Sequence, residues 1–530
     1  MNFRGWRRAA WASGGAAVAV LLFLAYLQQS RQVAAGSDGA SIALQGWDML
    51  HGNLLLHGWT VSDVSFYLTE LPQYALVEAV RGLSPDVVHI AGAMTYALVV
   101  LLAAWLATGS TAGRQALVRL LVVAFIMVAP APGADYTLLM SPDHYGSTVP
   151  VLLAWLAIDR LPSRWYQPVV VALLLTWGQI SDSLILVTGV VPIVVAAGTR
   201  AGVRFWRRAG GGTDAWLAVA AIVSTGLARG IAAGIRDSGG YGEQPVGTTF
   251  SGLAALPHHL VLTGQGLLTL FGADFFSPQS GPDVAFAAVH LIGVAAVAVA
   301  VVLALAQLGR GRDLVVPGLA VAIVFNIVTY LPSLFVQDLK STREISAVLP
   351  FGAVLAARLL ARPRDPEATQ ATRKWSRAVL PVLAAGVLVC AAELGYQAVQ
   401  PSQPAQNQSL AAWLVARHLT AGLAPDYWVA NATTVDSGGR VTIRQVAQSG
   451  QTLYFPQPRE LKSSWFVPDR HDPRFVAVDL SRPNAAAYLA AAVHTFGSPA
   501  QTLRPAGYTV LVWRFNLLTR LEGTQPASQG

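Results

Sequence analysis

The sequence predicts a mainly α, polytopic α-helical membrane protein with a small α/β domain at its C-terminal end. Of its 530 residues, 54% are hydrophobic and 12% are charged, and the mean hydropathy is +0.48. Soluble globular proteins carry about 25% charged residues. Long apolar runs recur up to residue 395, and a polar segment of mixed patterning follows them. These observations exclude a soluble globular fold for the first three quarters of the chain.

Charge and cysteine content narrow the function classes. A formal net charge of +8 and an isoelectric point near 9.7 suit nucleic-acid binding only if the basic residues gather on one soluble face. Here the arginines lie in short loops between apolar runs, so we expect the lipid bilayer as a partner and no nucleic acid. The single cysteine, Cys390, excludes an intramolecular disulfide.

About eleven apolar runs approach the roughly 17–25 residues that a membrane-spanning helix needs. The predicted spans are 11–27, 88–107, 116–131, 145–158, 166–179, 183–198, 215–235, 284–307, 314–331, 345–361 and 378–395. The fifth and sixth are short and the sixth contains Pro192, so 166–198 forms either two spans or one re-entrant hairpin. Both alternatives return the chain to the side it left.

The arginines set the predicted orientation, because cationic residues concentrate in cytoplasmic loops. A cytoplasmic N-terminus places most of them in such loops, among them Arg4, Arg7, Arg8, Arg114, Arg119, Arg160, Arg164, Arg200, Arg204, Arg207 and Arg208. We therefore expect a multi-pass protein of the plasma membrane whose C-terminal domain is extracytoplasmic. Small residues after the first run also fit a cleaved signal peptide, but ten further spans favour a retained anchor.

Acidic residues collect in the predicted outer loops, so polar chemistry is expected on the outer face. The long outer segments are 28–87, 237–283 and the tail after residue 395. A transporter usually keeps ionisable residues and broken helices near the membrane midplane. The sequence shows neither clearly, and we find no internal repeat.

The first outer loop is expected to contain two helices. In "SDGASIALQGWDML", Ile42, Met49 and Leu50 alternate at helical spacing with polar residues, which predicts an amphipathic helix lying along the membrane surface. A second helix is expected from Pro72 to about Arg81, because proline suits the first helical turn. The tryptophans Trp47 and Trp59 are interpreted as membrane-interface anchors.

The tail differs in composition from the rest of the chain. Residues 1–395 form the predicted membrane domain, 396–409 a Pro/Gln-rich linker, and 410–530 an extracytoplasmic α/β domain. In that domain "SLAAWLVARHLTAGL" and "NAAAYLAAAVHTF" predict helices, the second with Asn484 as its cap. The segments "YWVAN", "RVTIRQV", "RFVAVDL" and "YTVLVWRFN" predict strands. We find no catalytic motif there, and acceptor binding or docking is its expected role.

Several stretches resemble one family in their order and in the side of the membrane on which they fall. The first outer loop carries Asp38, "WDMLHGNLLLHGW" and "FYLTELPQYALVE"; the next carries "MSPDHYGSTVPVLLAWLAI"; the tenth span follows "STREISAVLPFGAVLAARLL". These stretches resemble the GT-C superfamily of membrane glycosyltransferases, and within it the protein O-mannosyltransferase and aminoarabinose-transferase branch. The resemblance covers about residues 1–395. The tail stretch "HLTAGLAPDYWVANATTVDSGGRV" is similar to tails of some bacterial transferases of this type.

The resemblance implies a function and a set of site residues. Such enzymes transfer a sugar from a polyprenyl-phosphate donor to an acceptor at the outer membrane face, with inversion. By its match to the family's first-loop acid, Asp38 would be the general base, which is typically worth about 10²–10⁴ in rate. Gly39 follows Asp38 where the mannosyltransferases have an Asp-Glu pair, which leaves the acceptor class open. The family matches also make Asp143 and His144 candidates for positioning acceptor or sugar.

Each candidate has a structural alternative. Asp38 could cap a helix, Asp48 could be a solvated face residue instead of a substrate contact, and Asp143 and His144 could form an ordinary turn after Pro142. The guanidinium of Arg343 could hold the carrier phosphate. Otherwise it pairs with Glu344 or with lipid headgroups.

No cofactor or metal site is expected. His258 and His259 have no further ligands at recognisable spacing, so we interpret them as loop residues, and a divalent metal is unsupported.

The sequence thus predicts a polyprenyl-phosphate-dependent glycosyltransferase acting on a glycan, lipid or protein acceptor of the cell envelope. One alternative is a flippase or transporter of lipid-linked saccharides. The other is a non-catalytic envelope-assembly protein that keeps the fold.

Overall fold

The structure is a computed structural model that describes residues 3–208, 212–244, 250–277, 280–309, 313–360, 370–457 and 459–526. The side chains of residues 1–12, with Arg4, Arg7 and Arg8, lie outside the described residues. The chain forms two compact units. Unit 1 comprises residues 1–32, 92–229 and 247–401, and unit 2 comprises residues 33–91, 230–246 and 402–530. The domain boundaries predicted at residues 395 and 410 stay a prediction.

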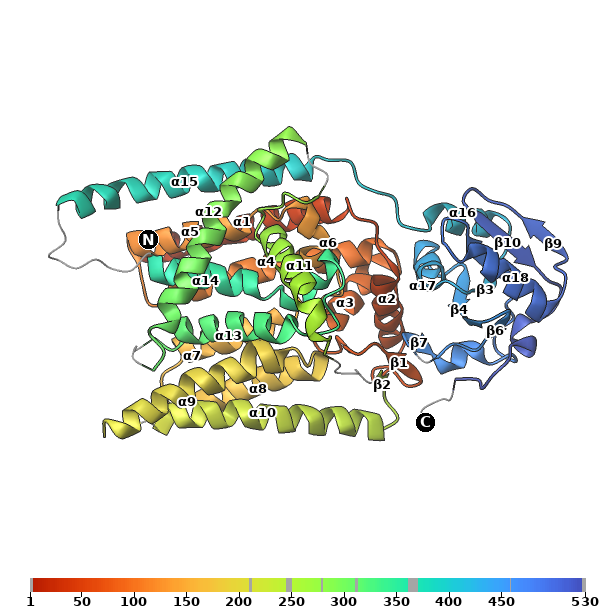
Figure 1. Cartoon of the computed structure of the whole chain (residues 1–530), viewed down its shortest axis with the longest axis horizontal. Helices are drawn as coiled ribbons and strands as arrows, with labels where there is room; N and C mark the ends of the chain where they lie inside the picture. The colour runs from red at the N-terminus through yellow and green to blue at the C-terminus, as the bar shows by residue number, and fades with distance from the viewer. Residues whose placement is uncertain are drawn as a thin grey trace. The chain divides into compact units, whose positions relative to one another are not determined.

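Unit 1 is helical (Figure 1). Its helices, two of which (α4 and α10) extend into unit 2, are α1 (Phe3–Ser30), α4 (Asp86–Thr108), α5 (Gly113–Met127), α6 (Asp135–Leu138), α7 (Thr148–Arg160), α8 (Tyr166–Ser181), α9 (Val191–Trp206), α10 (Gly212–Asp237), α11 (Leu256–Leu270), α12 (Gly281–Leu305), α13 (Val315–Tyr330), α14 (Val348–Leu360) and α15 (Gln370–Ala398).

The predicted multi-pass membrane architecture is confirmed. Among the described residues, six helices are long and apolar enough to cross a membrane, or seven if a bent pair counts as one span. The other predicted spans coincide with the shorter helices α7, α8, α13 and α14, so the count of eleven stays a prediction. The predicted sixth span belongs to one apolar stretch, Leu186–Trp206, which begins with a π-helical segment, Leu186–Val190.

One feature of unit 1 corrects the sequence analysis, which found no clear broken helix. Helix α5 and the segment Pro132–Leu138 are bent by 80° relative to each other. The break falls at "VAPAPG", where two prolines remove backbone donors and fix φ, so a continuous helix cannot form. The chain therefore has a broken or re-entrant element at this point.

Helix α14 lies in the core of unit 1, where it packs against α5, α12 and α13 (Figure 1). It is buried from Val348 to Leu359. Near its end, the buried guanidinium of Arg358 lies 2.8 Å from the carboxylate of Asp159 and 3.2 Å from that of Asp313. Because a buried charge is costly without partners, these pairs join the end of α14 to α7 and to the segment before α13.

Unit 2 combines a pair of packed helices with an α/β fold. The first outer loop forms α2 (Ser37–Leu50) and α3 (Leu71–Arg81), which pack on each other as the two predicted helices. A five-stranded sheet has the order β4-β3-β8-β10-β9. Its strands are β3 (Ala421–Ala424), β4 (Thr442–Gln445), β8 (Phe475–Asp479), β9 (Gln501–Leu503) and β10 (Tyr508–Val512). Strand β3 is parallel to β4 and β8, and β10 is antiparallel to β8 and β9.

The remaining elements of unit 2 surround this sheet. They are α16 (Gln408–Ala416), α17 (Tyr427–Asp436), α18 (Ala485–Phe496), the hairpin of β5 (Ala447–Ser449) and β6 (Thr452–Tyr454), and a small sheet of β1 (Trp59–Val61), β2 (Gly242–Glu243) and β7 (Leu461–Lys462). Two buried apolar clusters form the core. One centres on Phe466 and Val476, and the other on Phe475 and Val510.

Three predictions about unit 2 were wrong. The segment "YWVAN" is the start of helix α17 and not a strand, because the Asp426 carboxylate accepts a hydrogen bond from the Trp428 N–H and caps the helix. The helix predicted from "SLAAWLVARHLTAGL" ends at Ala416, and its last residues enter β3. Trp59 is 1% exposed and therefore cannot be an interface anchor.

Candidate functional site

Helices α2 and α17 are joined by side-chain hydrogen bonds, which brings the first outer loop against the C-terminal segment within unit 2. The Ser37 hydroxyl donates to the Tyr427 carbonyl at 2.7 Å. One turn further on, the Asn431 amide donates to the Ser41 hydroxyl at 2.9 Å. Ser37, Ser41 and Asn431 are buried, so these bonds are shielded from water. They fix the first turn of α2, which carries Asp38.

Asp38 belongs to a cluster of two carboxyl groups and one phenol. The Tyr427 hydroxyl lies 2.6 Å from the Asp38 carboxylate and also contacts the Glu460 carboxylate. Asp38 lies in the first turn of α2, where the helix dipole favours a negative charge. The N-cap position is Gly36, so Asp38 does not cap α2. Asp38 is partly exposed, while Glu460 is only 5% exposed.

Proton counting defines the state of this cluster. The Tyr427 hydroxyl has one proton and contacts two carboxyl groups, so it donates to one of them and must accept from the other. Burial, and then the nearby Asp38 charge, raise the pKa of Glu460 to about 8. Burial and both carboxylates also hold the pKa of Tyr427 well above its ordinary value. At neutral pH the chain of donors therefore runs from the Glu460 carboxyl to Tyr427 and from Tyr427 to Asp38.

Asp48 has a different environment at the other end of α2. Its carboxylate accepts hydrogen bonds from the Lys462 ammonium at 2.9 Å, the Trp59 indole at 2.8 Å and the Asn53 amide at 2.6 Å. It is therefore not a simple solvated residue, although its side chain is 23% exposed, and the substrate contact stays a prediction. The contacts assign it a structural role that joins α2 to β1 and β7.

A second polar cluster lies in unit 1 and contains the other predicted site residues. The His144 imidazole lies 2.8 Å from Asp182 through Nδ1 and 3.1 Å from Glu344 through Nε2. The Ser147 hydroxyl donates to Asp182 at 2.6 Å, and the His144 N–H donates to Asp143 at 2.8 Å. Loops before α7, after α8 and before α14 thus meet, and they bring Asp143 and His144 close to Arg343, the neighbour of Glu344.

Electrostatics fix the charge of this second cluster. Burial lowers the pKa of His144, but Glu344 and Asp182 outweigh burial and hold that pKa well above its ordinary value. Burial raises the pKa of Asp143 to about 7, although Arg343 and His144 oppose the rise. His144 is therefore an imidazolium at neutral pH, held between two carboxylates.

Arg343 is the exposed member of the second cluster. Its side chain is 40% exposed, and its Nε lies 3.8 Å from the Glu344 carboxylate. At that distance the two charges do not share a hydrogen bond, and the Glu344 side chain is 15% exposed. The contact with the carrier phosphate stays a prediction. The predicted pairing with Glu344 and the predicted phosphate contact are compatible.

Histidines elsewhere in unit 1 do not extend either cluster. His258 and His259, predicted as loop residues, lie in the first turn of helix α11, and the His259 Nδ1 lies 2.7 Å from the Leu331 carbonyl. The buried set of His290, Cys390 and Glu393 offers donors that a metal could use. However, His290 lies 2.8 Å from Glu393, which is hydrogen-bond spacing, and the Cys390 thiol donates to a backbone carbonyl. Internal hydrogen bonds thus account for all three groups.

Tyr427, Glu460, Asp182 and Glu344 complete the clusters and were missed as site residues by the sequence analysis. Asp182 and Glu344 lie in predicted outer loops, and this predicted side of the membrane was the signal that could have identified them as site residues. Tyr427 is separated from Asp38 by 389 positions, and no local pattern connects them.

Comparison with known proteins identifies the fold. No family model matches the sequence, and no curated protein matches it. Among solved structures, the chain is similar to ArnT from Cupriavidus metallidurans bound to undecaprenyl phosphate. The TM-score is 0.59 at 12% sequence identity, over 97% of this chain and 99% of that one. The GT-C-like membrane fold expected from the sequence is therefore confirmed.

Proposed function

We propose that the chain is a membrane glycosyltransferase that transfers a sugar from a polyprenyl-phosphate donor to an acceptor on the extracytoplasmic face. The fold supports this proposal, because the similar ArnT structure holds undecaprenyl phosphate. The observation that carries it is the Asp38 cluster. It combines a partly exposed carboxylate with a buried, protonated partner linked through Tyr427.

Asp38 acts as the general base in this proposal. As the acceptor hydroxyl attacks the anomeric carbon, a carbon–oxygen bond forms and the proton passes to the Asp38 carboxylate. The bond from the anomeric carbon to the phosphate oxygen breaks on the opposite side, so configuration inverts and the polyprenyl phosphate leaves with the electron pair. A general base typically contributes about 10²–10⁴ in rate, or roughly 3–5 kcal/mol of barrier.

Glu460 and Tyr427 position Asp38 and tune its surroundings. With Glu460 protonated, Asp38 does not face a second negative charge at close range, and the Tyr427 hydroxyl fixes the orientation of its carboxylate. One oxygen of Asp38 accepts from Tyr427, which leaves the other for the acceptor. Loss of the Glu460 proton at alkaline pH would put two anions around one phenol and disrupt this arrangement.

Arg343 contacts the donor phosphate in this proposal. A guanidinium binds phosphate oxygens through two parallel hydrogen bonds and stays charged at every working pH. The His144 imidazolium, with Asp182 and Glu344, holds the loop that carries Arg343 in place. Asp143 remains a proposed contact for sugar or acceptor.

The experiment places purified protein in liposomes with a panel of polyprenyl-phosphate sugars. If the protein is a transferase, we expect it to release free polyprenyl phosphate when an acceptor extract is present. Movement of intact donor across the bilayer without release would instead support a flippase, for which the bent element after α5 offers a structural reason. If the protein neither releases polyprenyl phosphate from any donor nor moves any donor across the bilayer, the proposal is overturned. That result would support a non-catalytic assembly protein.

A further inference from the structure

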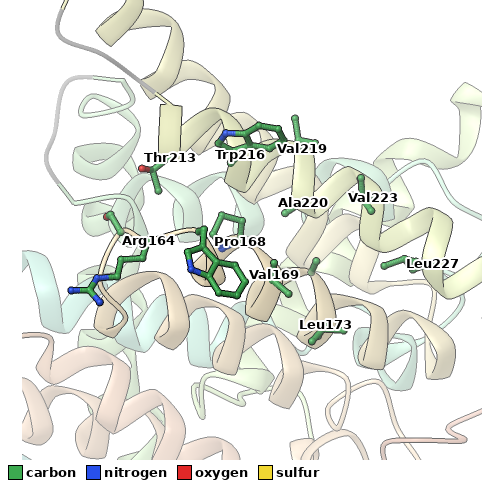
Figure 2. A pocket seen from close by; sticks show the side chains of 13 residues that line it. Arg164, Pro168, Val169, Leu173, Thr213, Trp216, Val219, Ala220, Val223 and Leu227 are labelled. Atoms are coloured by element: carbon green, nitrogen blue, oxygen red, sulfur yellow. The ribbon is translucent and has the colours of Figure 1, made fainter.

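A groove of about 600 Å³ lies between helices α8 and α10 of unit 1 (Figure 2). Its volume falls within the roughly 300–1,000 Å³ typical of ligand sites. Pro168, Val169 and Leu173 line it from α8, while Val219, Val223 and Leu227 line it from α10. Arg164 and Trp216 lie at the end of the groove where α8 and α10 begin, which we call its mouth (Figure 2). Trp165, next to Arg164 in the sequence, also lines the groove.

Side-chain hydrogen bonds join the two helices near the end of α8. Near the end of α8, the Gln179 amide donates to the Ser224 hydroxyl at 2.9 Å, and the Thr225 hydroxyl donates to the Gln179 carbonyl oxygen at 2.9 Å. These polar bonds fix the helices to each other in apolar surroundings. Among the described residues, no such bond joins the first turns of α8 and α10, where Pro168, Val169 and Val219 line the groove.

The walls of the groove face outward, as expected for a surface that contacts lipid. Leu173 is 59% exposed and Val223 is 48% exposed. From Trp216 to Leu227 the helix rises by about 16 Å at 1.5 Å per residue. That rise matches one half of a hydrocarbon core of about 30 Å. The groove is therefore about one leaflet deep.

The mouth of the groove has the chemistry of a membrane interface that carries positive charge. Trp165 is 82% exposed and Trp216 is 65% exposed, and exposed tryptophans favour the headgroup level. Arg164 is exposed beside them, and no carboxylate pairs with it among the described side chains. In contrast, Arg200 on α9 is paired with Asp214 at 2.5 Å. A guanidinium at the headgroup level is complementary to an anionic phosphate.

We propose that this groove binds one anionic glycerophospholipid, with an acyl chain between α8 and α10 and its headgroup phosphate on Arg164. The positive-inside prediction makes the leaflet the cytoplasmic one. The site is independent of the glycosyl-transfer proposal, because none of its residues belongs to the Asp38 or His144 cluster.

Native mass spectrometry of the purified full chain tests the proposal. The protein is equilibrated with phosphatidylglycerol, phosphatidylcholine or polyprenyl phosphate, and bound lipid is counted. We expect one tightly retained phosphatidylglycerol, with retention reduced about tenfold in Arg164→Gln, the loss of one charge-assisted phosphate contact. Ala220→Phe, which fills the groove, should abolish retention. Arg207→Gln removes an exposed arginine outside the groove and should leave retention unchanged.

The other outcomes overturn the proposal. An equal loss of retained phosphatidylglycerol in Arg164→Gln and Arg207→Gln would show only a general attraction of the surrounding lipid to positive charge. Unchanged retention in Ala220→Phe would place the lipid elsewhere, and equal retention of phosphatidylcholine would refute recognition of net charge. Selective retention of polyprenyl phosphate would identify the groove as a carrier site instead. Thermal unfolding of each variant checks that the fold is intact.

Discussion

Replacement of Glu460 by glutamine is expected to remove a large part of the pH dependence of stability. Glu460 is 5% exposed, and burial together with the Asp38 charge raises the pKa of its carboxyl to about 8. A glutamine amide can donate to the Tyr427 oxygen as the protonated carboxyl does. The variant should therefore keep the hydrogen-bonded cluster but lose its titration.

The magnitude follows from linkage. The folded state keeps a proton that the unfolded chain, with a pKa near 4.5, has already lost at neutral pH. The stabilising contribution is fully present below pH 4.5 and is lost as pH rises through about 8. At about 1.36 kcal/mol per pK unit, the wild type should lose about 3 kcal/mol between pH 6 and pH 9 from this group alone.

Thermal unfolding of the whole chain, followed from pH 6 to pH 9, measures the effect. The unfolding midpoint of the wild type should fall as pH rises, and that of Glu460→Gln should fall less. Glu522→Gln, an exposed glutamate of the same unit, serves as the matched control and should keep the wild-type slope. If Glu460→Gln and the wild type show the same slope, Glu460 does not hold the proton and the assignment of donors in the cluster is wrong.

Three further predictions concern the remaining candidate residues. Arg343→Ala should raise the KM for the lipid donor roughly 10- to 100-fold through loss of a charge-assisted phosphate contact, and Arg343→Lys should restore part of the donor affinity. Initial rates measured against donor concentration give the KM of both variants, and an unchanged KM excludes a phosphate contact. His144→Gln should lower the free energy of unfolding by about 3–5 kcal/mol, because two carboxylates lose their cation. Since the pKa of His144 is raised, this loss of stability should be largest below that pKa and should shrink above it. A loss of stability that does not change with pH would contradict the ion-pair assignment. Asp48→Ala should cost about 1–3 kcal/mol by leaving Lys462 without its anion, and a thermal midpoint equal to that of the wild type would refute its structural role.

Local patterns were sufficient for most of the membrane part of the fold, but not for the break after α5 or for helix α11, whose histidines were expected in a loop. Apolar length located the helices, and amphipathic spacing with a proline at the first turn located α2 and α3 correctly. In the tail, alternating apolar residues identified β8 and β10. The segment from Tyr427 was predicted as a strand because its aromatic and β-branched residues favour strands, whereas a helix begins there with a capping hydrogen bond from the Trp428 N–H to the Asp426 carboxylate.

The candidate site could be predicted only in part. Asp143 and His144 were selected from one loop and Arg343 from another, and they do meet in one cluster, because both are predicted outer loops that flank spans. The partners of Asp38 could not be predicted, since Tyr427 and Glu460 reach it through a tertiary contact across nearly the whole chain. The burial that raises the pKa of Glu460 is likewise a property of the folded unit.

The turnover of Asp38→Asn with a polyprenyl-phosphate sugar tests the central claim most directly. Asparagine keeps the size of the side chain and accepts a hydrogen bond from Tyr427, but it cannot take the acceptor proton. With Asp469→Asn, an exposed aspartate of the same unit, as the control, we predict release of free polyprenyl phosphate about 10²–10⁴ times slower in Asp38→Asn alone. Release at the wild-type rate by a folded Asp38→Asn protein would contradict the assignment of Asp38 as the base.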